Sequence, residues 1–453
     1  MGRVTHYDLV IHAPSALIDG MLQPAEVGVA GGRIAAISTE PLEGDEHVIL
    51  AEDEVLLPGI VDSHVHINEP GRTEWEGFAS ATRAAAAGGV TTVIDMPLNS
   101  IPATTTTAAL EAKRSVADEK AIIDVGFWGG AVPENLGALK LLHDAGVFGF
   151  KAFLTPSGVD EFGHLDAAQL DAALEELAAF DGLLIVHAED PGVIDAHADD
   201  GGADYRRFVE SRPDEAEVTA IERVIAGVRR TGARAHILHL SSAKALPALR
   251  AARAEGLPIT VETCPHYLAI SAEQIGDGAT QYKCCPPIRD DANRDLLWAA
   301  LVDGDIDIVV TDHSPSTAAL KFQGGADASS GDFQLSWGGI AGLQLGLSAV
   351  WTEASSRGIP LERVLGWMSR GPADFVGLAH KGRIAVGADA DLVAFAPDAT
   401  FTVHAEELLH RNPVSAYDDR ELKGVVRRTW LRGEPVSTAP DAPAAGRLLS
   451  RLP

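Results

Sequence analysis

Cysteine, basic residues and long apolar runs are all scarce in this 453-residue chain. The three cysteines, two of them adjacent (Cys284 and Cys285), exclude a disulfide framework and favour a reducing compartment. A net charge of −29 argues against nucleic acid or an anionic membrane as a partner. No apolar run approaches the roughly 20 residues of a membrane span, and no signal-peptide core is visible near Met1. We therefore expect a cytoplasmic protein with a solvated acidic surface.

Residues that commonly bind metals are present, and each one closes an apolar run. His64 and His66 end the run that begins at Val55. Side chains two positions apart on a strand point to the same face, so this pair can hold one ion, although an HxH motif alone is weak support for a site. Four further candidates each follow an apolar run of their own: Lys151, His187, His239 and Asp312. This recurrence is difficult to attribute to core packing.

The spacing of these positions predicts a barrel. A (β/α)8 barrel uses roughly 30 residues per unit, so Lys151 lies about three units after His64, and Asp312 about two units after His239. The candidates then fall on strands one, four, five, six and eight. The remaining strands are predicted at 90–95, 122–127 and 259–262, with helices over 166–180, 215–230 and 243–255. In such barrels the carboxyl ends of the strands form one catalytic face.

Both flanks of the predicted barrel are rich in short β-strand patterns. They occur at 7–11, 26–30 and 33–38, and again at 390–396, 401–404, 424–432 and 435–437. We predict an α/β protein: a TIM (β/α)8 barrel over residues 58–380, and a small β-sandwich domain built from both termini, residues 1–57 and 381–453. The small, polar stretch 323–332 is the best candidate for a mobile loop near the site.

Four histidines and one carboxylate suit zinc or a similar divalent ion. Lys151 is the unusual member, because an ammonium group cannot bind a cation. Near two metal ions its pKa should fall, and carbon dioxide could convert the neutral amine into a carbamate that bridges both ions. Alternatively, Lys151 is a lysine at a strand end that extends to solvent or contacts substrate phosphate.

A bridged metal pair would lower the pKa of a shared water molecule and polarise a substrate carbonyl. Asp312 would then orient or deprotonate the hydroxide and later pass a proton to the leaving nitrogen. The predicted reaction class is metal-assisted hydrolysis.

Six segments carry a resemblance to the cyclic amidohydrolases of the amidohydrolase superfamily, which include dihydroorotase, hydantoinase (dihydropyrimidinase) and allantoinase. They are 58–66, 149–153, 187–189, 239–242, 311–315 and 387–392. The resemblance implies that His64, His66, Lys151 and Asp312 hold one metal ion, and that Lys151, His187 and His239 hold the other. It also implies N6-carboxylation of Lys151, a catalytic role for Asp312 and a homotetramer.

Within this family the segment 64–78 resembles the allantoinases. Similar dihydroorotases have an arginine that binds the substrate carboxylate where this chain has Asn68, and an asparagine suits a neutral substrate such as allantoin. The resemblance implies hydrolysis of the hydantoin ring of allantoin to allantoate, a step of purine degradation, by a hydroxide that bridges the metals. It also implies substrate contacts at Asn68, Asn99, Cys285 and Gly338.

Two alternatives stay open at this point. Hydantoinases usually have a tyrosine a few residues after the carboxylated lysine, and residues 151–158 contain none, which leaves hydantoinase as the second candidate enzyme. Some relatives of hydantoinase are non-catalytic oligomeric scaffolds, but those proteins lose metal ligands, whereas all six positions are filled here.

Overall fold

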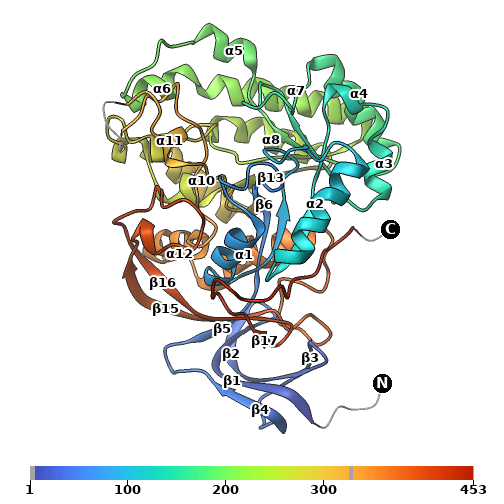
Figure 1. The fold of residues 1–453 in the computed structure, drawn as a ribbon, viewed down its shortest axis with the longest axis vertical. Coiled ribbons are helices and arrows are strands. Elements are labelled where there is room, and N and C mark those ends of the chain that lie inside the picture. Colours follow the sequence, from blue (N-terminus) through green and yellow to red (C-terminus); the bar gives the residue numbers. More distant parts are fainter. Residues whose placement is uncertain (1–5, 326–329, 452–453) are drawn as a thin grey trace.

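The computed structural model describes residues 6–325 and 330–451. Its upper part in Figure 1 is a barrel of parallel strands surrounded by helices. The barrel strands are β6 (Ile60–Val65), β7 (Val90–Asp95), β8 (Asp124–Phe127) with β9 (Gly129–Gly130), β10 (Phe150–Phe153), β11 (Leu183–His187), β12 (Arg234–Ile237), β13 (Ile259–Thr263) and β14 (Ile308–Val309). These strands match the eight that the sequence predicts, with β8 and β9 sharing the third position.

Main-chain hydrogen bonds close the barrel. Strands β6, β7 and β8 form one parallel group, and β9 to β14 form another. The N–H of His66 donates to the carbonyl of His313 at 2.8 Å, which joins the first strand to the segment after the eighth. The predicted fold class is confirmed.

The apolar run before His64 differs from its expected form, because it is two strands and not one. β5 (Val55–Pro58) pairs with the terminal sheet, and β6 enters the barrel after Gly59. A Cβ atom at Gly59 would lie 2.1 Å from the Thr91 hydroxyl oxygen, so only glycine fits this crossing. Apolar periodicity does not reveal the break, because both strands are buried.

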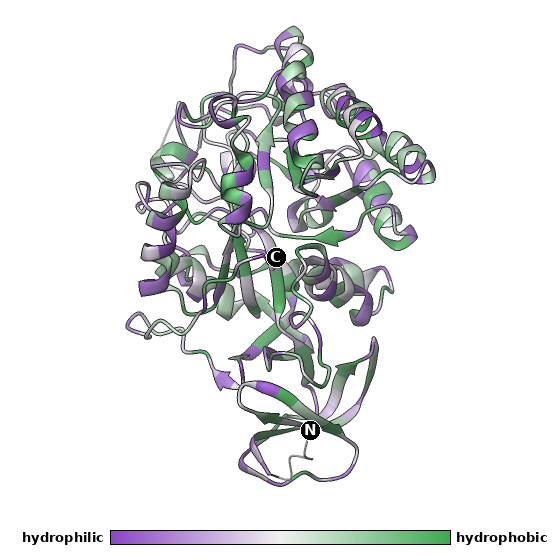
Figure 2. Cartoon of the chain, turned by 90° about the vertical axis from the view of Figure 1, so that its right-hand side faces the viewer, coloured by the Kyte–Doolittle hydropathy of each residue, from purple (hydrophilic) through white to green (hydrophobic). Residues whose placement is uncertain are grey.

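The second layer is an eight-stranded, mostly antiparallel sheet formed from both ends of the chain, as predicted. It combines β1 (Tyr7–Ile18), β2 (Met21–Ala30), β3 (Arg33–Ser38), β4 (Gly44–Ile49) and β5 with β15 (Leu392–Thr402), β16 (Glu421–Leu431) and β17 (Glu434–Pro435). It encloses its own apolar cluster, which includes Ile11, Val27 and Trp430. Figure 2 shows the strands of both layers as mainly hydrophobic and the outer helices as mixed.

The C-terminal segment also reaches the barrel. Val125 in β8 donates to the carbonyl of Arg447 at 3.0 Å, and Leu449 donates back to Val125 at 2.8 Å. The end of the chain therefore lies along a barrel strand. The proposed domain division is residues 58–380 for the barrel and residues 1–57 with 381–453 for the terminal domain. The C-terminal tail forms a contact between the two.

The outer helices begin and end where their sequences indicate. The predicted helices correspond to α4 (Ala167–Ala178), α7 (Asp214–Thr231) and α8 (Leu246–Ala254). Asp166 caps α4 together with Gln169, and α7 ends at Gly232, whose φ of 72° is left-handed. Other helices around the barrel are α1 (Phe78–Ala87), α2 (Thr107–Lys120), α3 (Leu139–Asp144), α10 (Asp291–Asp303) and α12 (Gly346–Ser356).

The sequence also led us to expect no membrane-spanning helix and a mobile loop over residues 323–332. Among the described residues, no helix has the length and apolar character that a membrane crossing needs. The proposed mobile loop 323–332 includes residues 326–329, which lie outside the described residues. Asp332, at its end, accepts hydrogen bonds from the main-chain N–H groups of Gly202 and Gln334.

A buried ion cluster joins the barrel to the terminal sheet. The Lys381 ammonium contacts Asp124 at the start of β8, Asp391 at 2.6 Å and Asp389 at 3.1 Å. The Lys381 side chain is 4 % exposed. Removing this cation would leave buried carboxylates without their main partner.

We expect Lys381→Met to lower the free energy of unfolding by about 3–5 kcal/mol, measured by denaturant titration. Arg230→Met is the matched control, because Arg230 forms an exposed ion pair with Asp171 and its loss should cost less than about 1 kcal/mol. Equal effects in both variants would contradict a joining role for the cluster.

Candidate metal centre and active site

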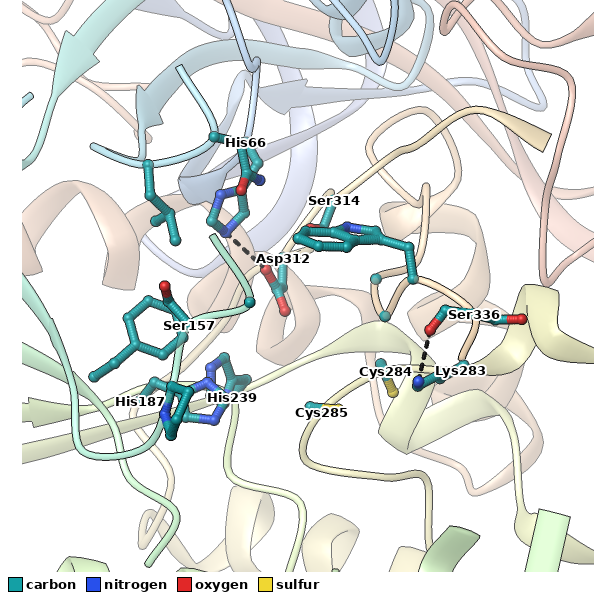
Figure 3. A pocket seen from close by; sticks show the side chains of 18 of the residues that line it. His66, Ser157, His187, His239, Lys283, Cys284, Cys285, Asp312, Ser314 and Ser336 are labelled. Carbon is teal, nitrogen blue, oxygen red and sulfur yellow. Dashed lines mark hydrogen bonds and ion pairs between the residues drawn. The ribbon is translucent and has the colours of Figure 1, made fainter. Parts of the chain in front are cut away.

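The strand ends bring the predicted ligands together at the carboxyl face of the barrel. Asp312 Oδ1 lies 3.1 Å from His64 Nε2 and 3.4 Å from His66 Nε2. The potential ligand atoms of these three residues all lie within 4.8 Å of one another. Figure 3 shows His66 and Asp312 directed toward each other across the pocket. One half of the predicted centre is therefore a compact donor group.

The remaining candidates complete a continuous cluster beside this group. The rings of His187 and His239 are 4.7 Å apart in an edge-on arrangement, and His239 lies 5.5 Å from the ring of His64. Lys151 is 1 % exposed, and its Nζ lies 4.7 Å from the centre of the Phe153 ring. The structure thus brings all six predicted ligand positions to one site.

Local backbone geometry at the site is unusual. The backbone is left-handed, a conformation that residues other than glycine seldom adopt, at four positions of the site. The φ values are 65° at Asn68, 62° at Asn99, 35° at His239 and 45° at Asp312. Such conformations cost free energy and occur often at functional sites, where the surrounding fold imposes them. The turns after the first, second, sixth and eighth strands thus place at the site residue types, Asn, Asp and His, that tolerate this region better than most.

Burial keeps most of the histidines neutral. It lowers the pKa of His66 to about 4, and it also lowers the pKa values of His187 and His239. For His64 burial opposes the charged form, but the carboxylates of Asp312 and Glu262 raise its pKa to about 9. A neutral imidazole is the form that binds metal.

Burial also lowers the pKa of Lys151, to about 8, so that its neutral amine is more accessible than in water. Asp312 behaves in the opposite way. Burial favours its protonated form, but the charge of His64 and hydrogen bonds from His64 and His66 hold the pKa of Asp312 well below its usual range. Asp312 is therefore a carboxylate at neutral pH.

Three buried carboxylates, which the sequence did not indicate, orient the predicted ligands. Glu262 accepts a hydrogen bond from His64 Nδ1, Glu189 bonds His187 Nε2 at 2.7 Å, and Asp62 accepts from the main-chain N–H of His64 at 3.1 Å. The first two contacts fix which ring nitrogen of His64 and of His187 stays free for a metal ion, and the third holds the main chain at His64. The sequence could have indicated two of these carboxylates, because Asp62 lies two residues before His64 and Glu189 lies two residues after His187.

A cavity of about 330 Å³ opens beside the cluster. Its wall includes the metal-ligand candidates His66, Lys151, His187, His239 and Asp312, and also Asn99, Cys285 and Gly338. Three of the four predicted substrate contacts therefore face the cavity.

Asn68 is placed differently from expectation, because it does not line this cavity. It is 0 % exposed, and its Nδ2 lies 3.4 Å from the carbonyl oxygen of Pro315. Its Oδ1 has no hydrogen-bond partner among the described residues. The left-handed turn at Asn68 directs its side chain toward the loop after strand eight, and alternation along a strand cannot foresee such a turn.

Two buried lysines hold the loop that carries Gly338. Lys283 donates to the carbonyls of Gln334 at 3.1 Å and Ser336 at 2.6 Å, and Figure 3 shows the second of these bonds. Lys321 donates to the carbonyls of Trp337 at 3.1 Å and Gly339. Both ammonium groups are thus used within the protein, and they shape the cavity wall.

Most of the chain matches one family of known proteins. Residues 55–436 match the model of the amidohydrolase family. The chain belongs to the amidohydrolase family. Amidohydrolases are generally metal-dependent, which agrees with the buried His64–His66–Asp312 group.

Individual relatives refine this assignment. An allantoinase of Streptomyces avermitilis is 56 % identical, over 98 % of this chain and 99 % of its own. An allantoinase of Saccharomyces cerevisiae is 48 % identical, over 84 % of this chain and 83 % of its own. Among solved structures, the L-hydantoinase (dihydropyrimidinase) of Arthrobacter aurescens has a TM-score of 0.91 at 29 % identity, covering 98 % of this chain and 100 % of that one. The structural neighbour confirms the barrel fold, and the sequence relatives support the resemblance to allantoinases.

The residues of the cluster fit a metal centre on their own chemistry. His66 Nδ1 and His239 Nδ1 are buried without a hydrogen-bond partner among the described residues, and the Nε2 atom of His64 faces only the Asp312 carboxylate, at 3.1 Å. Buried polar atoms are normally satisfied, so orphaned imidazole nitrogens beside a carboxylate indicate a missing electrophilic partner. A divalent ion provides one.

The three thiols of the chain differ in accessibility, and this difference leads to a prediction. Cys264 and Cys284 are buried, and burial raises the pKa values of both. Cys284 and Cys285 both belong to the cavity wall, but Cys285 is partly exposed, whereas Cys284 is only 2 % exposed. Thiol reagents should therefore inhibit by modifying Cys285, and a bound substrate or ring analogue should protect.

We expect Cys285→Ser to remain active and to lose at least about 10-fold in inactivation rate by such a reagent. Cys284→Ser is the control and should keep the sensitivity of the parent protein. Inhibition that is unchanged in Cys285→Ser would assign the reactive thiol to Cys264 or Cys284 and return Cys285 to a packing role.

Proposed function

We propose that this protein is an allantoinase, which hydrolyses the ring amide of allantoin to give allantoate in purine degradation. The observation that carries the proposal is the set of six ligand positions at one site, five of them lining the cavity and His64 in contact with Asp312, in a chain that is 56 % identical to an allantoinase over nearly its whole length. The test is hydrolysis of allantoin by metal-reconstituted protein, measured beside hydantoin, dihydrouracil and dihydroorotate.

The centre is proposed to be binuclear. His64, His66, Lys151 and Asp312 would hold one ion, and Lys151, His187 and His239 the other. Imidazole and carboxylate donors suit zinc, which we take as the native ion. The lowered pKa of Lys151 and its burial among these groups support carboxylation by carbon dioxide, which would turn its amine into a bridging anion. When bound, the two ions would lower the pKa of a water molecule and polarise the scissile carbonyl.

Asp312 is the proposed catalytic acid–base. Its carboxylate lines the cavity, is ionised at neutral pH and is oriented by His64 and His66. It accepts the proton of the attacking water molecule and returns it to the ring nitrogen that leaves. The rigid turn at Asp312 keeps this oxygen at the cavity wall.

Substrate binding is assigned to residues on three separate loops. The Asn99 side chain faces the cavity and can donate and accept hydrogen bonds with the amides of the ring. Gly338 and Cys285 also line the cavity and lie next to each other, since a Cβ at Gly338 would be 3.6 Å from the Cys285 sulfur. Asn68 is proposed to shape the site from behind the cavity wall. We also propose a homotetramer, which light scattering of the purified protein tests.

Hydantoinase (dihydropyrimidinase) is the second candidate. It is favoured by the structural neighbour with a TM-score of 0.91 and opposed by the lower identity of 29 %. The residue two positions after Lys151 is Phe153, which stacks on His187 at 4.7 Å and offers no hydroxyl to an oxyanion. Faster turnover of hydantoin or dihydrouracil than of allantoin would favour this candidate.

A further inference from the structure

Arg212 lies in the cavity wall beside the histidine cluster, and neither the metal centre nor the proposed substrate contacts include it. Glu189 holds its guanidinium from one side, with Nε at 3.0 Å from Oε1 and Nη2 at 2.6 Å from Oε2. The same carboxylate bonds His187 Nε2 at 2.7 Å. Arg212 is thus aligned with the metal cluster through one shared carboxylate, in the planar two-point geometry that orients a guanidinium most firmly.

The main chain at Arg212 is held equally well. Arg212 follows α6 (Tyr205–Ser211), and its carbonyl accepts a hydrogen bond from Arg289 Nη2 at 3.3 Å. Arg289 is itself buried and paired with Glu217 at 2.8 Å. These contacts fix both ends of the Arg212 side chain, so its free nitrogen has a defined direction.

Nη1 is that free nitrogen. Among the described residues it has no hydrogen-bond partner, although the side chain is only 18 % exposed and lines the cavity. Lys283, another cation in the same wall, is directed to main-chain carbonyls of the loop that carries Gly338. Arg212 is therefore a residue of the cavity wall with a held guanidinium and one donor that no described residue uses.

We propose that Arg212 Nη1 donates a hydrogen bond to the carbonyl oxygen of the ureido group that allantoin carries on its ring. This inference rests on the proposed function. The scissile ring amide must face Asp312 and the histidines, whereas Arg212 lies beyond His187, where a substituent of the ring can reach. Glu189 already neutralises the guanidinium, so the pair suits a neutral carbonyl better than a second carboxylate. Arg212 is then a specificity-determining residue for ureido-substituted rings.

The test compares allantoin with hydantoin, which has the same ring and no ureido group. Arg212→Lys keeps a cation beside Glu189 but loses the Nη1 donor. We expect its kcat/KM on allantoin to fall about 10- to 100-fold, chiefly through a higher KM. Hydantoin, measured as a substrate or, where turnover is slow, as a competitive inhibitor, should change less than about 2-fold. Metal content should stay at the wild-type value.

The matched control is Arg223→Lys, because Arg223 pairs with Asp190 and does not line the cavity. It should leave both substrates unaffected. An equal loss on allantoin and hydantoin, or a loss of metal in Arg212→Lys, would overturn the proposal and assign Arg212 to supporting His187 through Glu189. Unchanged kinetics on allantoin would also overturn it. A wild-type protein that hydrolyses hydantoin but not allantoin would instead contradict the proposed function.

Discussion

Lys151→Ala is expected to lose most of its bound metal and at least about 1,000-fold in kcat on allantoin. In the proposed centre this change leaves three protein ligands at one ion and two at the other. The residue is 1 % exposed, and its Nζ lies over the apolar ring of Phe153. The measurement is metal analysis of the purified variant, together with its activity.

The control for this experiment is Lys283→Met, which also removes a buried cavity lysine but not a proposed ligand. Its metal content should equal that of the wild type. Small carboxylic acids should partly restore metal binding to Lys151→Ala by occupying the vacated bridge. Wild-type protein assembled without carbon dioxide should bind less metal, and bicarbonate should restore it. Retention of two ions per subunit in Lys151→Ala, with only a raised KM, would show that Lys151 contacts substrate and does not bridge metals.

The second large effect concerns substrate choice. We expect kcat/KM for allantoin to exceed that for dihydroorotate by at least about 100-fold, because a buried carboxylate without a partner costs roughly 3 kcal/mol or more. The arginine that binds this carboxylate in similar dihydroorotases is replaced by Asn68. Two cations of the cavity wall are already engaged, Arg212 with Glu189 and Lys283 with main-chain carbonyls. Comparable turnover of dihydroorotate would refute the allantoinase assignment.

Two variants at Asn68 distinguish the role of its side-chain amide from the role of its left-handed backbone. Asn68→Arg should impair allantoin hydrolysis without removing metal, because no proposed ligand is changed and a long cation does not fit a fully buried position. Asn68→Gly suits the φ of 65° and removes only the amide, so it is the matched control for the backbone. Loss of metal in Asn68→Gly would show that the amide supports His66, which lies two residues earlier.

The ligand set was predictable because its signals are local. Alternation along a strand places His64 and His66 on one face, and the repeat of a βα unit places Lys151 and Asp312 at the same end of the barrel. Strand β7 was predicted with its observed bounds, and β13 to within one residue. Buried parallel strands appear in a sequence as continuous apolar runs, which is why these elements were visible.

Residue types and their spacing thus determined the fold class, and they predicted six ligand positions that the structure brings to one site. The tertiary structure decided the break at Gly59, the burial of Asn68 behind the cavity and the assembly of Glu262, Glu189 and Arg212 around the histidines. These features depend on contacts between segments far apart in the chain, such as His64 with Glu262. Local periodicity carries no information about such contacts, because the packing of loops and side chains creates them only when the barrel closes.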